Sequence, residues 1–398
     1  MSHASHEPRG ARPKLEIGEL FRQYADRLPF RSVQQSRVVR ALSSCRTAAL
    51  GGHERTCDRC DFRERSYNSC RNRHCPKCQG LDEVRWREAQ ESLLLPIPYH
   101  HVVFTIPEAL HQLFLDRPRL AYSSLFAAVA ETLQEVALRP SNLGARIGFT
   151  AVLHTWTQTL MFHPHIHCIV TGGGLHPEER RWIAAKARFL FAVRILGRVF
   201  RGKLLGRLEK DLEQGEFRVS KRDGRNDLRD AARKEWIVYS KPPFAGPQSV
   251  LRYLARYTHR IAISNHRLVA HEDGKVTFRW RDRSQGDIPK LMTLDAMEFL
   301  RRFLLHVLPA GFMRVRHFGL LANASRKVSL ATSRSLLGAK PVPTATLPES
   351  ETWQELFERI TGRDPTRCPK CPSGRLIISE TLPPQTSRGR APPGGVAG

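Results

Sequence analysis

Residues 162–170 read Phe-His-Pro-His-Ile-His-Cys-Ile-Val, and three glycines follow at 172–174. Pro164 cannot donate a hydrogen bond to a sheet, so we expect a strand to begin just after it and to end at the glycine turn. Side chains two residues apart on a strand share a face, with backbones about 6–7 Å apart, so His165 and His167 would face one point. Such a pair suits a divalent metal ion. The structural alternative is a pair of hydrogen-bonded core or surface histidines.

A second strand is expected just before this stretch, over residues 147–158. Its even-numbered positions share a face, and two of them, His154 and Gln158, carry side chains that can bind metal. If the two strands form a hairpin across 159–164, one of these side chains would complete a three-ligand set with His165 and His167. Open positions would then remain for substrate oxygens and water. We favour His154 on ligand chemistry and keep Gln158, because the register is not fixed by the sequence.

The composition indicates a polyanionic partner. Among 398 residues, 64 lysines and arginines face 38 acidic residues, for a net charge of +26. Nucleic acid is favoured over a membrane surface, since there is no apolar run of about 18 residues and no basic amphipathic helix with a consistent apolar face. The N-terminal residues lack the apolar segment of a signal peptide, so we expect a cytoplasmic protein.

Nine cysteines in a reducing compartment are expected to bind metal before they form disulfides. Two C-x-x-C pairs, separated by fourteen residues, predict one structural zinc site with four thiolate ligands and no open position. The expected ligands are Cys57, Cys60, Cys75 and Cys78, with Cys70 as a possible substitute. A further pair, Cys368 and Cys371, forms half a site that is either completed by distant ligands or vestigial.

Basic residues predict where DNA would bind. The zinc stretch carries Arg71 and Arg73, a composition suited to phosphates. Residues 180–210 contain ten lysines and arginines against the single acid Glu209, more than a solvated face requires.

A helix expected after Gly246-Pro247 contains Tyr253 and Tyr257. Their i, i+4 spacing places both phenols on one helix face. The pair could pack in a core; alternatively, nearby cations could favour the phenolate and hold a phosphate for nucleophilic attack. These cations, which we also expect to bind DNA, are Arg252, Arg256 and Arg260.

The remaining pattern predicts helices at 15–28, 32–45, 81–95, 293–308 and, interrupted at Pro118, 110–138. Strands are expected at 100–106 and 236–240, and a hairpin is expected at 266–283 with Asp273-Gly274 as its turn. Residues 214–230 are expected to form a loop or hairpin.

Together these motifs resemble the two-tyrosine HUH transposases of rolling-circle insertion sequences. The resemblance rests on SYNSCRNRHCPKCQ (66–79), HTW (154–156), HPHIHCIVTGGG (163–174) and YLARYTHRIAISN (253–265), and it extends over about residues 51–329. It implies an α+β fold: an HUH-endonuclease-like central antiparallel sheet flanked by helices, preceded by a small helical zinc-knuckle domain. The expected divisions are residues 1–95, a nuclease domain at 96–335, and a Pro-rich linker, knuckle and disordered tail at 336–398.

The resemblance also implies a function. The histidines would hold Mg²⁺ or Mn²⁺, and a tyrosine would nick single-stranded DNA at the transposon ends through a 5′-phosphotyrosine, before joining to target DNA. A bacterial, nucleoid-associated location follows. The alternatives are a rolling-circle replication initiator or relaxase-like nuclease, a non-catalytic zinc DNA-binding regulator, and a hydrolase that activates water.

Overall fold

The computed structural model describes residues 15–78, 80–91, 93–186, 190–241, 249–250, 262–339 and 351–385. The chain divides into two compact units. Unit 1 takes residues from both ends, Met1–Leu81 and Ser350–Gly398, and unit 2 is Asp82–Glu349. This division differs from the three consecutive regions expected from sequence, because the chain after residue 350 returns to the N-terminal unit.

Unit 1 combines a helix pair with a small sheet. Helices α1 (Ile17–Tyr24) and α2 (Val33–Ser44) pack against each other. Gly18 permits their close approach, since a Cβ there would lie 2.7 Å from the Leu42 carbonyl oxygen. The sheet has the order β12-β1-β2 and is antiparallel throughout. Its strands are β1 (Gly52–Cys57), β2 (Arg63–Tyr67) and β12 (Leu376–Leu382), and α11 (Trp353–Thr361) precedes β12.

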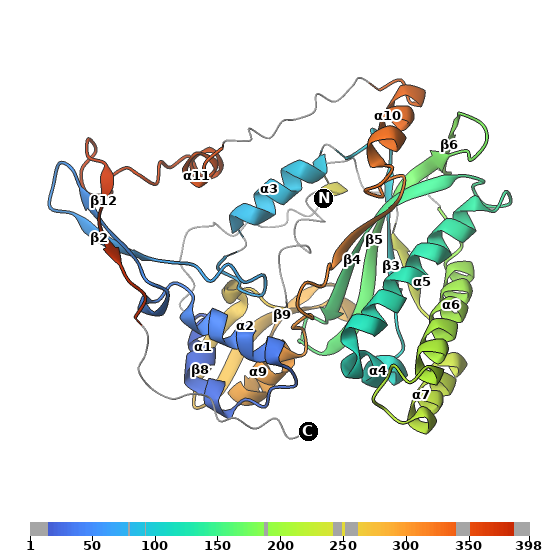
Figure 1. The fold of residues 1–398 in the computed structure, drawn as a ribbon, viewed down its shortest axis with the longest axis horizontal. Helices are drawn as coiled ribbons and strands as arrows, with labels where there is room; N and C mark the ends of the chain where they lie inside the picture. The colour runs from blue at the N-terminus through green and yellow to red at the C-terminus, as the bar shows by residue number, and fades with distance from the viewer. Residues whose placement is uncertain are drawn as a thin grey trace. The chain divides into compact units, whose positions relative to one another are not determined.

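Unit 2 is built on a six-stranded antiparallel sheet with the order β11-β4-β5-β3-β7, in which β6 also pairs with β5 (Figure 1). The strands are β3 (Tyr99–Thr105), β4 (Arg146–Trp156), β5 (Phe162–Leu175), β6 (Trp182–Ala184), β7 (Val238–Lys241) and β11 (Val315–Gly319). The expected α+β class, with a central antiparallel sheet flanked by helices, is therefore confirmed.

Helices cover one face of this sheet (Figure 1). They are α4 (His111–Asp116), α5 (Pro118–Leu138), α6 (Val193–Glu213) and α7 (Lys221–Arg233). Phe104, Ile166 and Cys168 project from the sheet into the main hydrophobic core beneath them. Because neighbouring residues on a strand point to opposite faces, this core directs the odd-numbered residues of β5 to the other face.

The second face of the sheet carries a smaller hydrophobic cluster. Tyr99, Val152 and Ile169 pack there with Val250 and with Leu330 of α10 (Arg326–Leu336). Trp86 of α3 (Gly80–Glu91) packs against the same cluster. This second face is therefore partly buried and partly available for a site.

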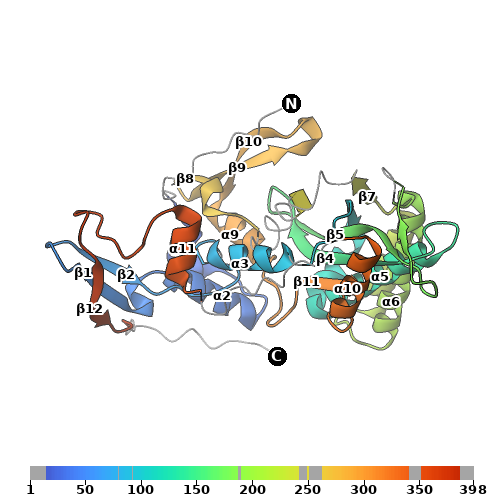
Figure 2. The ribbon, with the colours of Figure 1, turned by 90° about the horizontal axis from the view of Figure 1, so that it is seen from above.

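A meander of three strands follows β7 in the described chain: β8 (Leu268–Glu272), β9 (Lys275–Asp282) and β10 (Ile288–Asp295), shown in Figure 2. Asp273 and Gly274 both have positive φ, 49° and 71°, as a two-residue hairpin turn requires. The expected hairpin is therefore confirmed. Helix α9 (Ala296–Leu304) begins after Asp295, whose carboxylate accepts from the backbone amides of Met297 and Glu298. It is shorter than the helix expected at 293–308 because β10 includes 293–295.

Two further expectations were wrong. Strand β5 runs through both Pro164 and the glycines. Pro164 is tolerated because pairing with β3 ends at His165 and pairing with β4 is irregular beyond it. Residues 214–230, expected as a loop or hairpin, contain most of α7. The helix buries only Gly224, Leu228 and Ala231, and charged residues between them obscure its apolar periodicity in the sequence. In the expected C-terminal region 336–398, α11 and β12 lie between residues 340–350 and 386–398, which are outside the described residues.

Within the described residues, no helix is both long and apolar enough to cross a membrane.

Candidate functional site

Three histidines converge on the second face of the unit 2 sheet. His154 of β4 lies directly opposite His165 of β5, and His167 lies two residues further along β5. One ring nitrogen from each of these three residues lies within 4.8 Å of the others. His154 and His167 are buried, and His165 is partly exposed. The hairpin register thus brings His154 to the pair, whereas Gln158 lies in the connecting turn.

Hydrogen bonds orient two of these rings. The backbone oxygen of His163 lies 2.6 Å from Nδ1 of His165, which leaves Nε2 of that ring for a metal ion. On His167, Nδ1 lies 2.9 Å from Nε2 of His101, and the two rings stack with centroids 5.1 Å apart. Metal-binding histidines usually have such a partner on the other nitrogen. Three imidazoles on two adjacent strands therefore fit a divalent cation.

His101 is a further residue of this site, and it was not among the residues expected from the sequence. It lies on β3, and its pairing with Ile169 places it diagonally next to His167. The adjacent pair His100-His101 could have predicted this residue, since one of two neighbouring strand residues must point to the sheet face that carries His165 and His167.

The two tyrosines and Arg252, Arg256 and Arg260 lie outside the described residues. Ser249 and Val250 are described, are helical, and precede Tyr253 in the sequence. Val250 packs with Tyr99, Val152 and Ile169 on the histidine-bearing face.

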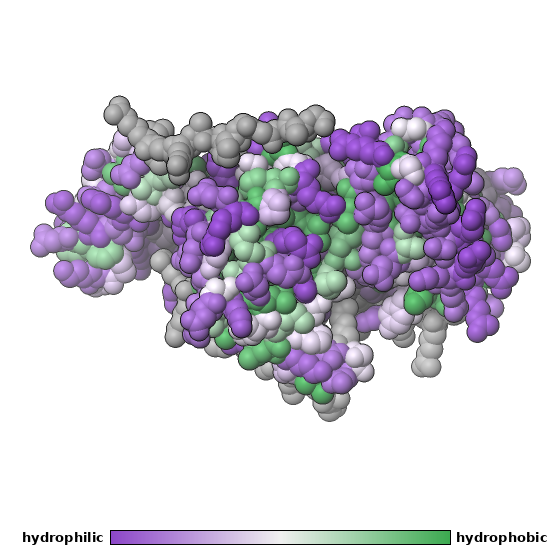
Figure 3. Space-filling view, turned by 90° about the horizontal axis from the view of Figure 1, so that it is seen from below, coloured by the Kyte–Doolittle hydropathy of each residue, from purple (hydrophilic) through white to green (hydrophobic). Residues whose placement is uncertain are grey.

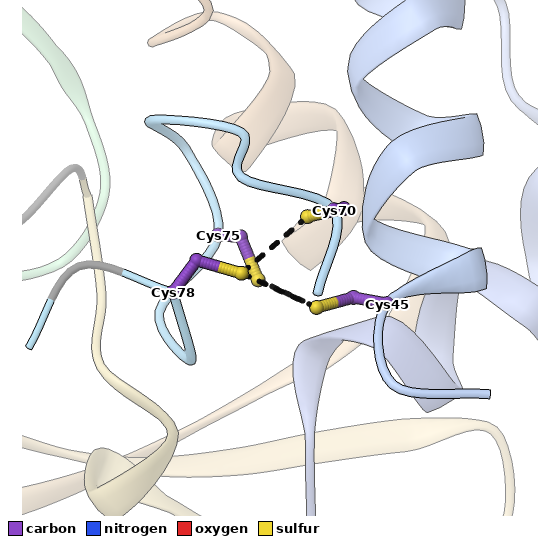
Figure 4. A group of neighbouring side chains, drawn as sticks. All are labelled: Cys45, Cys70, Cys75 and Cys78. Carbon is purple, nitrogen blue, oxygen red and sulfur yellow. Dashed lines mark hydrogen bonds between the residues drawn. The ribbon is translucent and has the colours of Figure 1, made fainter. Parts of the chain in front are cut away.

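The cysteines form two four-thiol clusters, so the single site expected from Cys57, Cys60, Cys75 and Cys78 is wrong. Cluster 1 is Cys45, Cys70, Cys75 and Cys78, whose side chains point toward one another in Figure 4. The Sγ atom of Cys78 lies 3.4 Å from that of Cys45 and 3.7 Å from that of Cys70, and the Cys45 and Cys75 sulfurs are 3.5 Å apart. Hydrogen bonds from Cys70 and Cys75 lower the pKa of Cys45 to about 7.

Cluster 2 joins Cys57 and Cys60 to Cys368 and Cys371, so distant ligands complete the C-terminal pair. All nine cysteines are free of disulfides, and Cys168, the ninth, lies alone in the unit 2 core. The number of cysteines could have predicted the second cluster, because the eight cysteines other than Cys168 are enough for two tetrahedral sites.

The basic residues have different surroundings. Arg71 is exposed in the loop after Cys70. Arg73 is half-buried, which lowers its pKa. On α6, Lys203 and Arg207 form ion pairs with Glu131 of α5, so this part of the basic stretch is neutralised within the protein.

Other basic residues of unit 2 face solvent. Arg194, Arg198 and Arg201 line a cavity of about 380 Å³ with Glu235 and Trp236. On α7 every arginine is exposed, and the surface of unit 2 around α7 is mostly hydrophilic in the space-filling view (Figure 3). Among the α7 arginines, Arg225 forms an ion pair with Glu213 and Arg233 forms one with Asp230.

Comparison with known proteins agrees with this arrangement. Residues 148–328 match the family described as "Putative transposase", and residues 17–106 match "Transposase zinc-binding domain". The chain is 47% identical over 383 residues to "Putative transposase y4qJ" of Sinorhizobium fredii (strain NBRC 101917 / NGR234), which covers 93% of this chain and 96% of the relative. It is 28% identical over 371 residues to the transposase for insertion sequence element IS801 of Pseudomonas savastanoi pv. phaseolicola, covering 90% and 86%. No solved structure matches the chain.

The site and the matches define a transposase that carries a zinc-binding region. The chain belongs to the IS91 family of insertion-sequence transposases, the family of the IS801 protein. The family expected from sequence is thereby confirmed. Cluster 1 lies wholly within the matched zinc-binding domain and supports a structural zinc ion there.

Proposed function

We propose that this transposase nicks and joins single-stranded DNA through 5′-phosphotyrosine intermediates with the help of a divalent metal ion, and so moves an insertion sequence by a rolling-circle route. Single-stranded transposon ends and target DNA are its substrates, in the cytoplasm at the bacterial nucleoid. The observation that carries the proposal is the convergence of His154, His165 and His167 from two paired strands.

The histidines are proposed as the ligands of Mg²⁺ or Mn²⁺. When bound, the ion polarises the scissile phosphate and offsets the charge that develops on it. The chain itself orients the ligands. The backbone oxygen of His163 binds Nδ1 of His165, and Nε2 of His101 binds Nδ1 of His167. Both metal-binding rings therefore present Nε2 toward one point. The site is at the end of the β4–β5 hairpin, where His165 remains partly exposed to substrate.

Tyr253 and Tyr257 are proposed as the nucleophiles. The phenolic oxygen of one tyrosine loses its proton and bonds to phosphorus, the bond from phosphorus to the 3′ oxygen breaks, and that oxygen takes a proton to leave as a 3′ hydroxyl. The second tyrosine then cuts the other end while the first still holds its strand. Energy is conserved in the phosphotyrosine bond, so joining needs no ATP. Burial of Val250 on the histidine-bearing face supports this assignment, since Val250 precedes Tyr253 by three residues.

DNA binding is proposed for Arg71 and Arg73 in unit 1 and for Arg252, Arg256 and Arg260 beside the tyrosines. Arginine suits this role because its planar guanidinium binds phosphate in a bidentate way. The net charge of +26 supports a long phosphate contact.

The test is a denaturing gel after incubation with Mn²⁺ and labelled single-stranded DNA from the element's ends. We expect a labelled protein–DNA adduct that disappears when Tyr253 and Tyr257 are both changed to Phe, while DNA binding persists. Tyr239→Phe is the matched control, because Tyr239 is exposed on β7 and is assigned no role. That variant should form the adduct at the wild-type level.

Two other outcomes would overturn the proposal. Cleavage without an adduct would indicate a nuclease that activates water. Binding without cleavage of any end sequence would indicate a DNA-binding regulator.

A further inference from the structure

We propose that cluster 2 binds a second structural zinc ion, which joins the N-terminal and C-terminal segments of the chain into one zinc-binding unit. Its ligands are Cys57, Cys60, Cys368 and Cys371. The matched zinc-binding domain ends at residue 106 and therefore contains only half of this ligand set. The proposal is independent of the nuclease chemistry.

The sulfur positions fit a tetrahedral zinc site. The Sγ atoms of Cys57 and Cys371 are 3.6 Å apart, and those of Cys60 and Cys368 are 3.7 Å apart. A zinc–sulfur distance of about 2.3 Å places two sulfurs of a tetrahedron about 3.8 Å apart. A disulfide would require about 2.05 Å. The four thiols are therefore spaced for an ion between them and not for covalent pairing.

The backbone around each pair has the form of a zinc knuckle. The amide of Arg59 donates to Sγ of Cys57 at 3.3 Å, and the amide of Lys370 donates to Sγ of Cys368 at 3.4 Å. At Gly374 there is no room for a side chain, since a Cβ would lie 2.2 Å from Sγ of Cys57 and 2.7 Å from Sγ of Cys371.

Strand pairing aligns the two knuckles. Cys57 at the end of β1 pairs with Leu376 at the start of β12, and the red C-terminal strand lies beside the blue N-terminal strands in Figure 1. Next to the ligands, the Asp58 amide donates to the Arg375 carbonyl at 3.0 Å, and the Arg375 amide donates to Oδ1 of Asp58 at 2.7 Å. Two ligand pairs more than 300 residues apart in sequence thus meet through regular backbone hydrogen bonds.

The sheet also needs a source of stability other than a core. Along β12 the side chains of Ile377 and Ile378 are 54% and 65% exposed, and β1 has one buried residue, Gly52. A small sheet that buries so little apolar surface is normally held by a metal or disulfides. Binding of the ion closes a long loop and contributes directly to folding.

The experiment is a count of metal per chain, by elemental analysis of the full-length protein purified without chelator. We expect two zinc ions in the wild type and one in the double variant Cys368→Ser/Cys371→Ser. Cys168→Ala is the control, because this buried cysteine belongs to neither cluster, and it should retain two ions. One ion in the wild type, or an unchanged count in the double variant, would overturn the proposal.

A second pair of variants keeps the test decisive if the double variant misfolds. Cys371→His preserves a Cys₃His ligand set, so the cobalt-substituted protein should still hold two ions but with an altered thiolate-to-cobalt absorption band. Gly374→Ala leaves all eight ligands in place and should lower the count to one by steric contact with two sulfurs. An unchanged cobalt spectrum in Cys371→His would refute cluster 2 as a metal site.

Discussion

Replacing His101 by alanine is expected to weaken metal binding without removing a ligand. Nε2 of His101 lies 2.9 Å from Nδ1 of His167, and the parallel rings are both buried. When His167 presents Nε2 to a metal, its Nδ1–H donates to His101. Loss of that acceptor frees the His167 ring to rotate and leaves a buried donor without its partner.

The size of the effect follows from this single contact. Removing a hydrogen-bond partner of a metal-binding histidine typically lowers metal affinity about 10- to 100-fold, which corresponds to about 1.4–2.7 kcal/mol. His101→Gln should recover part of the loss, because its side-chain oxygen can accept from Nδ1 of His167.

The assay is calorimetric titration of the full-length, zinc-loaded protein with Mn²⁺. His100→Ala is the matched control: His100 and His101 are 2% and 3% exposed, but neighbouring strand residues point to opposite faces. His100→Ala should lower stability similarly and leave the Mn²⁺ affinity unchanged. Equal weakening by both alanine variants, or an affinity within twofold of wild type for His101→Ala, would refute the reasoning.

Three further predictions follow from other parts of the molecule. The double variant Arg194→Ala/Arg198→Ala should bind single-stranded DNA more weakly, with the slope of log K against log salt reduced by about 0.7 per lost phosphate contact. Fluorescence anisotropy measures both quantities, and an unchanged slope would show that this surface of α6 does not contact DNA. Cys75→Ser should unfold unit 1, detected by limited proteolysis, while Mn²⁺ affinity at the histidines stays the same; a matching loss of Mn²⁺ binding would contradict their independence. Burial lowers the pKa of His306 to about 4, below the value of about 6.5 for an unfolded histidine. The free energy of unfolding should therefore be constant above about pH 6.5 and fall by up to about 3 kcal/mol as the pH drops toward 4. Urea unfolding should show a smaller fall for His306→Gln, and an equal fall would show that His306 is not responsible.

The sequence by itself determined the features that depend on local geometry. The alternation of strand residues placed His165 and His167 on one face, and the Asp273-Gly274 pair marked a hairpin turn. Each C-x-x-C pair was recognisable as a knuckle because two residues between cysteines set the loop that brings their thiols together.

Only the tertiary structure decided which distant groups meet. The register of β4 against β5 brought His154 rather than the turn residue Gln158 into the histidine cluster, and a one-residue slip would have sent His154 to the opposite face. A C-x-x-C knuckle carries no information about which other pair completes its site. The pairing of β12 with β1 therefore assigned Cys368 and Cys371 to Cys57 and Cys60, because strand pairing between the two ends of the chain is a property of the folded backbone and not of either local segment.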